Sequence, residues 1–321
     1  MSKTLVKISE KKKKTSSLDY PRLARELLKA SESEASGDAA TSKLAAGLYI
    51  VATPIGHLGD MTMRGLVTLA LADRVACEDT RVGGGLLSKY GIKKPLVSYH
   101  DHNADARRPE ILKHIEAGEA VALISDAGMP LIADPGYKLV RACRENGLLV
   151  NVIPGANAAL AALAGSGLPT DHFYFAGFLP PKTGARQKAL TEIKTMAATL
   201  VFYEAPQRLK DTLADMVKIL GADRQVAIGR ELTKLFEETR GGTLDEVANH
   251  YAVNVPKGEI VIVVAPPAKH AAEEHDLDAL LRTYLRTLSV RDAAAAACDV
   301  TGIKKSEVYA RALWLAGKNS G

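Results

Sequence analysis

A twelve-residue stretch at positions 125–136 combines the residue types that suit the binding of a small ligand. It follows the apolar run 120–124 and precedes a helical pattern, so we predict a loop at the carboxyl end of a buried strand. Such connections usually take about 4–6 residues, and longer ones tend to be functional. The stretch holds two carboxylates, two prolines and two glycines, which allow close backbone approach and a fixed loop shape. We therefore interpret it as a ligand loop rather than a rigid junction.

Three further loops of similar composition follow predicted strands, at positions 53–60, 78–81 and 154–158. Ligands of open α/β sheets bind outside the carboxyl ends of the strands, so we expect all four loops to converge on one cleft. The chain contains neither G-x-G-x-x-G nor G-x-x-x-x-G-K-[ST]. This absence argues against a common dinucleotide site and against a P-loop.

The segment His100-Asp101-His102 has the composition of a metal site. Residues two apart on a strand face the same side, so the two imidazoles could meet. A metal needs further ligands, and none lies at the ordinary spacing. We predict a surface loop or an RNA contact here, and no metal site.

The elements that must position these loops alternate along the chain. Short apolar or β-branched runs predict strands at 48–52, 75–77, 96–99, 121–124 and 149–153, with helices at 64–72, 86–90, 104–116, 137–146 and 156–163. A second set predicts strands at 172–175, 199–202, 225–228, 237–242 and 259–264, with helices at 185–195 and 207–220. Alternation of this kind is typical of βαβ crossovers and a mostly parallel sheet. The predicted organisation is a flexible basic tail at 1–45, α/β domains at 46–165 and 166–268, and a helical appendage at 274–318.

The composition is that of a globular protein, with 47% hydrophobic and 25% charged residues among 321. No apolar run reaches the ~18 residues of a membrane span, no secretory signal opens the chain, and three scattered cysteines suit a reducing cytosol. We therefore expect a cytoplasmic protein with no membrane partner. Six lysines and one glutamate in residues 1–14 account for the whole net charge of +5. Any binding of RNA must therefore depend on local clusters.

One such cluster lies in the two predicted C-terminal helices, 290–300 and 304–315. Lys304, Lys305 and Arg311 could contact phosphate as in helix-turn-helix modules. The apolar positions of the same helices predict packing into a small bundle. Packing is expected in either case, and the RNA contact is left open.

Several motifs together resemble the tetrapyrrole-methylase fold of class III S-adenosylmethionine-dependent methyltransferases. Within that family they are similar to the members that 2′-O-methylate a cytidine of 16S rRNA. The resemblance covers about residues 46–318 and is carried by Thr53-Pro-Ile-Gly56, Glu78-Asp-Thr-Arg81, the 125–136 loop, Phe202-Tyr-Glu-Ala-Pro206 and Gly229-Arg-Glu-Leu-Thr-Lys234. The chain departs from the family at His57, Met129 and Asn157, where Asn, Thr and Ser are usual.

This resemblance implies two α/β domains with a cofactor cleft between them, S-adenosylmethionine as cofactor and a homodimer. It also implies 16S rRNA or the small ribosomal subunit as partner. The positions of this chain that match the family's cofactor-binding residues are Pro54, Ser125, Asp126, Ala127, Ile132, Ala133, Asn157, Ala158 and Tyr203, and the resemblance implies that they bind the cofactor. Apolar walls with one carboxylate suit an adenosine and a sulfonium. Asp126 is the candidate carboxylate, and capping of its own loop is the equally weighted alternative.

Methylation of a ribose hydroxyl needs in-line placement of the reacting atoms and removal of a proton. Asp79 and Glu204, with Glu231 behind them, are the candidate bases because each follows a strand at the expected cleft edge. Arg81 and Arg230 would hold RNA phosphate or ribose. Ion pairs between such carboxylates and nearby arginines are the more common arrangement.

Two other functions stay open at this point. One is methylation of a tetrapyrrole ring on the same fold. The other is a ribosome-assembly factor that binds RNA without catalysis. The N-terminal lysines and the C-terminal helices favour RNA over a tetrapyrrole, since a tetrapyrrole enzyme has no need of either.

Overall fold

The computed structural model describes residues 19–23, 26, 29, 43–134, 136–267, 277–301 and 303–317 of the chain. Most of the predicted basic tail therefore lies outside the described residues. The described residues form two compact units. Unit 1 holds those up to Gly165 together with Gly229–Thr239 and Gly258–Val261, and unit 2 holds the rest. Two short segments that the sequence assigns to the second domain are thus part of unit 1.

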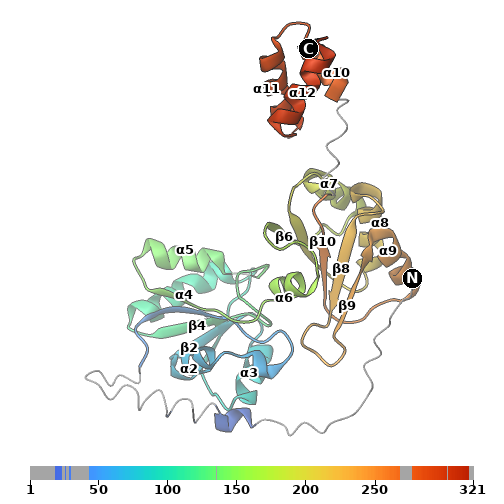
Figure 1. The fold of residues 1–321 in the computed structure, drawn as a ribbon. Coiled ribbons are helices and arrows are strands. Elements are labelled where there is room, and N and C mark those ends of the chain that lie inside the picture. The colour runs from blue at the N-terminus through green and yellow to red at the C-terminus, as the bar shows by residue number, and fades with distance from the viewer. Residues whose placement is uncertain are drawn as a thin grey trace. The chain divides into compact units, whose positions relative to one another are not determined.

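The sheet of unit 1 is parallel throughout and has the strand order β3-β2-β4-β1-β5 (Figure 1). All five predicted strands are confirmed, as β1 Gly47–Val51, β2 Arg74–Cys77, β3 Leu96–Ser98, β4 Ala120–Ile124 and β5 Val150–Ile153. Because the strands are parallel, their carboxyl ends lie at one edge of the sheet. The four predicted ligand loops therefore begin at that same edge.

Alternate side chains along the strands pack into two hydrophobic cores, one on each face of this sheet. Tyr49 and Val51 pack on one face with α2 Met63–Leu71 and α3 Thr80–Lys89. Leu48 and Ile50 pack on the other face with α4 Ala104–Glu116 and α5 Tyr137–Glu145. The two-residue period of a strand explains this division, and burial of both faces explains why the strands read as continuous apolar runs. The short 3₁₀ helix η1 Leu58–Asp60 and helix α6 Ala158–Gly165 complete the elements of unit 1 near the loops.

Helix α3 begins six residues earlier than the sequence predicts. Asp79 caps it by accepting a hydrogen bond from the Arg81 N–H, and its first turns contain Gly83, Gly84 and Gly85. These glycines are poor helix formers and hide the helical pattern. A Cβ at Gly83 would lie 2.9 Å from the Cys77 Sγ, so the close approach of the helix to β2 requires glycine there.

The second sheet has the order β6-β7-β10-β8-β9, formed by β6 Phe173–Phe178, β7 Thr199–Glu204, β8 Gln225–Arg230, β9 Glu238–Thr243 and β10 Ile260–Val264. Helices α7 Thr183–Ile193 and α8 Leu209–Leu220 match the predicted ones, whereas α9 Leu244–Val253 was not predicted. Its start is nevertheless visible in the sequence. Thr243 and Glu246 form a capping box in which each side chain accepts from the other's backbone N–H.

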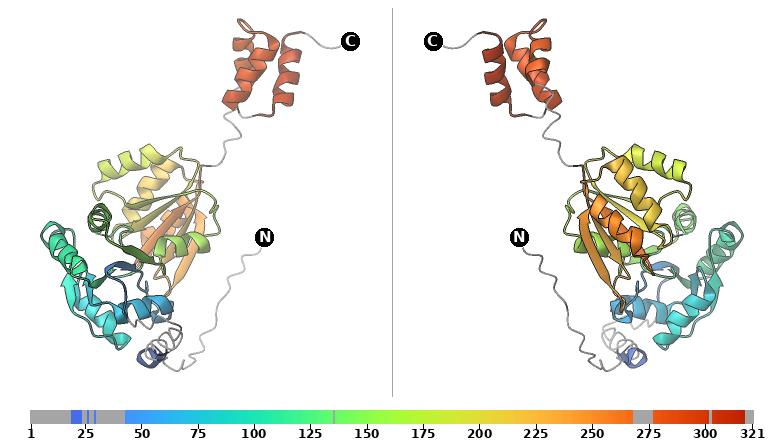
Figure 2. Two further views of the ribbon diagram at one scale, coloured as in Figure 1. Left: turned by 90° about the vertical axis from the view of Figure 1, so that its left-hand side faces the viewer. Right: turned by 90° about the vertical axis from the view of Figure 1, so that its right-hand side faces the viewer.

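Three C-terminal helices pack into a small bundle, as the apolar pattern predicts (Figure 2). They are α10 Leu277–Tyr284, α11 Val290–Thr301 and α12 Lys305–Leu315, and their core contains Leu281, Ala294, Ala297, Val308 and Ala312. Arg311 makes two hydrogen bonds to Asp278 at 2.6 and 2.7 Å and lies over the Trp314 ring. Lys304 and Lys305 are exposed at the start of α12.

The three cysteines are free thiols in different surroundings. Cys77 and Cys143 are fully buried in the two cores of unit 1, and burial raises the pKa of each to about 11. Cys298 on α11 is half-buried. Among the helices of the described residues, none has the length and apolar character to cross a membrane.

Candidate active site

The loops that follow β1 and β4 are joined by a short backbone bridge. The Thr53 N–H donates to the Gly128 carbonyl at 2.8 Å, and the Gly128 N–H donates back at 3.1 Å. The Ser125 hydroxyl also donates to the Gly128 carbonyl, at 3.2 Å. Gly128 has a φ of +84°, and a Cβ there would lie 3.2 Å from Ile55. The predicted convergence of these two loops is therefore observed, and it depends on glycine at this position.

The loop after β5 meets the β1 side of the same edge. A Cβ at Gly155 would lie 2.8 Å from the Ala52 Cβ, so the two backbones approach closely there. The Asn157 side chain accepts a hydrogen bond from the Leu160 N–H at 3.0 Å at the start of α6. Asn157 therefore caps this helix, and Ala158 is its first residue.

The 125–136 loop holds two non-glycine residues in the left-handed region, Leu131 with φ +70° and Ala133 with φ +65°. Each such residue costs on the order of 1 kcal/mol or more and persists where the surroundings fix it, often at ligand sites. Ile132, between them, leaves 40% of its surface exposed. The loop thus presents an apolar side chain on a backbone of fixed shape.

The candidate cofactor residues of unit 1 differ in accessibility. Asp126, Ala127, Ile132 and Ala133 are exposed, Asn157 and Ala158 are half-buried, and Pro54 and Ser125 are buried. The Ser125 hydroxyl is used within its own loop, where it donates to the Gly128 carbonyl. Tyr203 belongs to unit 2, where its ring makes edge contacts with Phe175 and Phe178.

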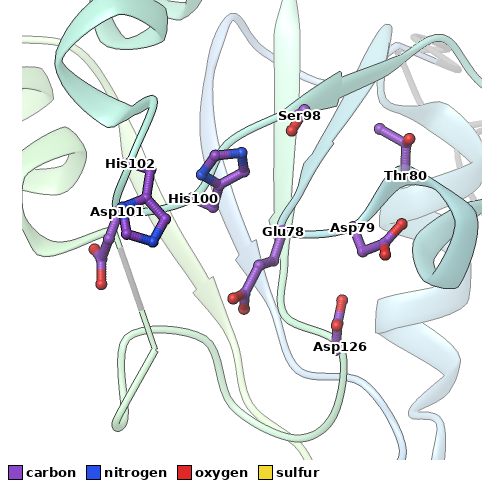
Figure 3. Close-up of a pocket in the computed structure, with 8 residues that line it drawn as sticks. All are labelled: Glu78, Asp79, Thr80, Ser98, His100, Asp101, His102 and Asp126. Atoms are coloured by element: carbon purple, nitrogen blue, oxygen red, sulfur yellow. The ribbon is translucent and has the colours of Figure 1, made fainter.

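A polar pocket of about 530 Å³ opens at the carboxyl ends of β2, β3 and β4 (Figure 3). It is lined by Glu78, Asp79, Thr80, Ser98, His100, Asp101, His102 and Asp126. In Figure 3 the Glu78 side chain lies between the two histidines and Asp126. A pocket with four carboxylates repels phosphate and favours cations or neutral hydrogen-bond donors.

Two carboxyl groups near this pocket hold their protons more tightly than usual. Burial raises the pKa of Asp134 to about 6, and the charges of Glu78 and Asp126 add to the effect. Partial burial and then the Asp126 charge raise the pKa of Glu78. Neither residue was predicted as a base from the sequence. Their raised pKa values come from partial burial in the folded loops, which the residue types alone do not indicate.

Asp79, by contrast, is bound to a neighbouring arginine. Its carboxylate accepts hydrogen bonds from the Arg81 Nη2 at 2.7 Å, the Arg81 Nε at 3.1 Å and the Arg81 backbone N–H at 2.8 Å. The guanidinium lowers the pKa of Asp79 to about 2. A carboxylate of such low basicity is a weak acceptor for a proton at neutral pH. The geometry therefore favours the ion pair over the role of base.

Glu204 of unit 2 has a side chain with no exposed surface. It accepts hydrogen bonds from the Thr212 hydroxyl at 2.6 Å and the Ala205 N–H at 2.8 Å, and Arg208 lies 3.2 Å away. Within unit 2 these partners occupy both carboxylate oxygens. This arrangement also favours a structural ion pair.

Arg230 and Glu231 have partners other than those the sequence suggests. Arg230 donates twice to the Glu238 carboxylate, at 3.0 and 3.1 Å. Glu231 accepts from the Lys234 ammonium at 2.8 Å and from the Glu259 N–H at 3.0 Å, and the lysine lowers its pKa. Of the two candidate RNA-binding arginines, Arg81 is the accessible one, with a side chain 90% exposed.

The rings of His100 and His102 lie 6.0 Å apart, with an angle of 65° between their planes. Within the part of the chain that the structure describes, no group of three or more metal-ligating side chains comes together.

Comparisons with known proteins agree with the observed fold. The model of the tetrapyrrole (corrin/porphyrin) methylases matches residues 47–248, and that of the RsmI C-terminal HTH domain matches residues 271–316. The chain is 51% identical to ribosomal RNA small subunit methyltransferase I of Mesorhizobium japonicum, over 84% of this chain and 92% of the relative. The protein of the same name from Escherichia coli is 45% identical over 83% and 94%.

Two solved structures share the fold at low sequence identity. Uroporphyrin-III-C-methyltransferase from Thermus thermophilus is 21% identical with a TM-score of 0.51, covering 68% of this chain and 94% of that one. Diphthine synthase is 14% identical with a TM-score of 0.54, covering 68% and 89%.

Proposed function

Because this chain belongs to the tetrapyrrole (corrin/porphyrin) methylase family, we propose that it methylates small-subunit ribosomal RNA, at the ribose 2′-hydroxyl of a 16S cytidine. The observation that carries the proposal is the identity of 51% and 45%, over most of both chains, to two ribosomal RNA small subunit methyltransferase I proteins. S-Adenosylmethionine is the methyl donor, and the reaction takes place in the cytoplasm. The match to the RsmI C-terminal helical domain supports RNA rather than a tetrapyrrole as substrate.

The loops of unit 1 fit the donor chemically. Exposed Ile132, Ala133 and Ala127 offer apolar contacts for an adenosine, and the exposed Asp126 carboxylate offers a partner for positive charge. The bound donor supplies an electrophilic methyl group on a sulfonium. The fixed backbone around Leu131 and Ala133 orients these contacts without reorganisation on binding. Tyr203 is a further residue proposed to bind the donor, from family position alone.

The acidic pocket is the proposed place of the target base. Carboxylates accept hydrogen bonds from the exocyclic amine of cytosine, and they repel the phosphates that flank it. Glu78 is the residue proposed for that contact, with His100 and His102 on its side away from Asp126. Arg81, exposed beside the pocket, is proposed to bind a phosphate.

A carboxylate that removes the ribose proton works best when its pKa lies near the working pH. Asp134, with a pKa of about 6, meets this condition better than Asp79, with a pKa of about 2. We therefore expect Asp134→Asn to lower turnover with both substrates bound by more than tenfold, and Asp79→Asn to lower it less than tenfold. Single-turnover rates at saturating cofactor and RNA measure this. Equal losses in the two variants would contradict the assignment.

The homodimer is proposed from an exposed apolar edge. Strand β6 is an outer strand of the second sheet, and it exposes Phe173, Tyr174 and Phe178 by 45%, 41% and 57%. Apolar residues gathered on an edge strand mark a surface that another chain covers. Phe178→Lys should shift the mass in solution from dimer to monomer in light scattering, and an unchanged mass would contradict this interface.

The reaction itself is tested with small ribosomal subunits from cells that lack this protein. Purified protein and labelled S-adenosylmethionine should place one methyl group on the ribose of a cytidine in 16S rRNA, as mass spectrometry of nuclease fragments would show. Cofactor binding without transfer would favour the non-catalytic assembly factor. Transfer to uroporphyrinogen but not to RNA would favour the tetrapyrrole reaction.

A further inference from the structure

We propose that the loop at 231–237 positions the first cofactor loop, at 53–60, with Thr233 and Lys234 as the positioning residues. This inference rests on the proposed function, since it assigns these two residues a part in S-adenosylmethionine binding. Both loops belong to unit 1 although they lie far apart in sequence.

The two loops are in direct contact. The His57 N–H donates a hydrogen bond to the Thr233 hydroxyl oxygen at 3.0 Å. A Cβ on Gly56 would lie 2.5 Å from the Lys234 Cγ and 2.8 Å from the Thr233 Oγ1. Distances under 3.0 Å are essentially never observed for real Cβ atoms, so the contact exists only because residue 56 is glycine.

The 231–237 loop is held from its other side. The Lys234 ammonium donates to the carboxylates of Glu231 and Glu259, at 2.8 and 3.1 Å. Glu231 in turn accepts from the Glu259 N–H at 3.0 Å, and its own N–H donates to the Glu259 carbonyl at 2.9 Å. A Cβ on Gly258 would overlap the Glu231 side chain, so this carboxylate packs directly on that turn.

The backbone of the same loop is strained at two residues. Glu231 has a φ of +50° and Thr233 a φ of +63°, in the left-handed region that β-branched residues such as threonine rarely enter. The Thr233 N–H donates to the Glu237 carboxylate at 3.1 Å, which supports this conformation. Strain of this kind persists only where surrounding contacts fix it. Here the contacts place the Thr233 hydroxyl against the 53–60 loop.

From His57 the connection continues to the loop proposed to bind the cofactor. The His57 Nδ1 accepts from the Gly59 N–H at 3.0 Å, which closes the turn that begins η1. Four residues earlier, Thr53 forms the bridge with Gly128 in the 125–136 loop. A displacement of the 53–60 loop therefore also moves the bridge on which the second loop depends.

The test is Thr233→Val, which keeps the β-branched shape and removes the acceptor for the His57 N–H. We expect the dissociation constant for S-adenosylmethionine, measured by calorimetry, to rise about three- to tenfold, the range of one lost hydrogen bond. The KM for the cofactor should rise by the same factor, while kcat at saturating cofactor stays within twofold. Thr233→Ser, which restores the hydroxyl, should recover cofactor affinity.

The matched control is Thr191→Val, which removes the hydroxyl that donates to the Gln187 carbonyl at 2.8 Å on α7 of unit 2. It should leave cofactor affinity unchanged. Hydrogen exchange measured by mass spectrometry gives a readout without cofactor: Thr233→Val should speed exchange in peptides covering 53–60 and not in those covering α7.

The outcomes separate this inference from the proposed function. If the natural protein does not bind S-adenosylmethionine, the proposed function fails. If the natural protein binds it and Thr233→Val binds it equally well, with unchanged exchange at 53–60, the positioning role is wrong. If Thr233→Val is too unstable to purify, Lys234→Met replaces it. That variant removes the ammonium that joins Glu231 to Glu259 and should produce the same rise in KM.

Discussion

At the scale of single residues, the acidic side chains near the pocket differ because their partners differ. Asp79 has Arg81 against it and stays ionised over the whole physiological range. Asp134 is partly buried and near other carboxylates, so it titrates around pH 6. Identical chemical groups thus acquire opposite properties from their surroundings, which is how one site can hold both a fixed charge and a proton acceptor.

The raised pKa of Asp134 predicts a pH dependence of stability. The folded protein holds this proton more tightly than the unfolded chain, with a pKa of about 6 against an ordinary value of 3.8. Its stabilising contribution is therefore complete below about pH 4 and is lost as the pH rises through about 6. Asp134→Asn should gain about 1–2 kcal/mol over the natural protein between pH 4 and pH 7, less than the full shift implies because the carboxyl is partly exposed.

Urea denaturation at several pH values measures this difference. Asp171→Asn, an exposed carboxylate of unit 2, controls for the change in net charge. A difference between Asp134→Asn and the natural protein that does not vary with pH would show that Asp134 has an ordinary pKa.

At the scale of elements, strands and helices are predicted best where the spacing of apolar residues in the sequence matches the side chains that are buried in the fold. The central strand Ala120–Ile124 was predicted because both of its faces are buried, which produces an unbroken apolar run. The outer strand β5 exposes Asn151 and Val152 and was predicted from its apolar and β-branched residues. The start of α3 was missed because glycine at 83–85 reads as a loop, although Gly83 is there to let the helix approach Cys77.

In the candidate site, the positions of the loops could be predicted from the sequence and the ion pairs between side chains could not. The convergence of the ligand loops follows from parallel strands and was predicted. The pairing of Arg230 with Glu238, and of Glu231 with Lys234, depends on side-chain geometry within a short loop, which no pattern of residue types specifies. Which carboxylates are paired and which are free could therefore not be predicted.

The capping box of α9 gives a prediction at this scale. Thr243→Ala removes the side chain that accepts from the Glu246 N–H at 3.2 Å and leaves that donor without its partner. Loss of such a cap costs roughly 0.5–2 kcal/mol of stability. Thermal unfolding should show a lower midpoint for Thr243→Ala, with Thr243→Ser close to the natural protein. Equal midpoints for alanine and serine would show that the cap contributes nothing measurable.

At the scale of the whole molecule, the C-terminal helices are a folded module with a core of their own. Leu281, Ala297 and Val308 form this core together with other apolar residues of α10–α12 and of the turns between these helices. The exposed Lys304 and Lys305 at the start of α12 give the bundle two cations that could contact phosphate. These helices are therefore expected to contribute to RNA affinity and not to the chemistry.

A chain that ends at residue 267 tests this division. It should keep the dissociation constant for S-adenosylmethionine within twofold of that of the full chain, because every residue proposed to bind the cofactor precedes residue 267. The KM for small ribosomal subunits should rise, most clearly at low salt, where phosphate contacts contribute most to binding. A truncated chain that loses cofactor binding while it remains folded would contradict this expectation.

The three thiols should react with an alkylating reagent at two very different rates, because two of them are buried in a core and the third is half-buried. A maleimide reacts with thiolate, and a thiol with a pKa of about 11 inside a core presents almost none at pH 7.5. Cys298 should therefore be labelled within minutes, whereas Cys77 and Cys143 should be labelled only when unit 1 unfolds locally or globally. The slow labelling rate of Cys77 and Cys143 then reports how often β2 and α5 become exposed. S-Adenosylmethionine stabilises the folded form, so it should lower this slow rate and leave the labelling rate of Cys298 unchanged. Labelling kinetics would thus follow ligand binding through the native cysteines, without an engineered one.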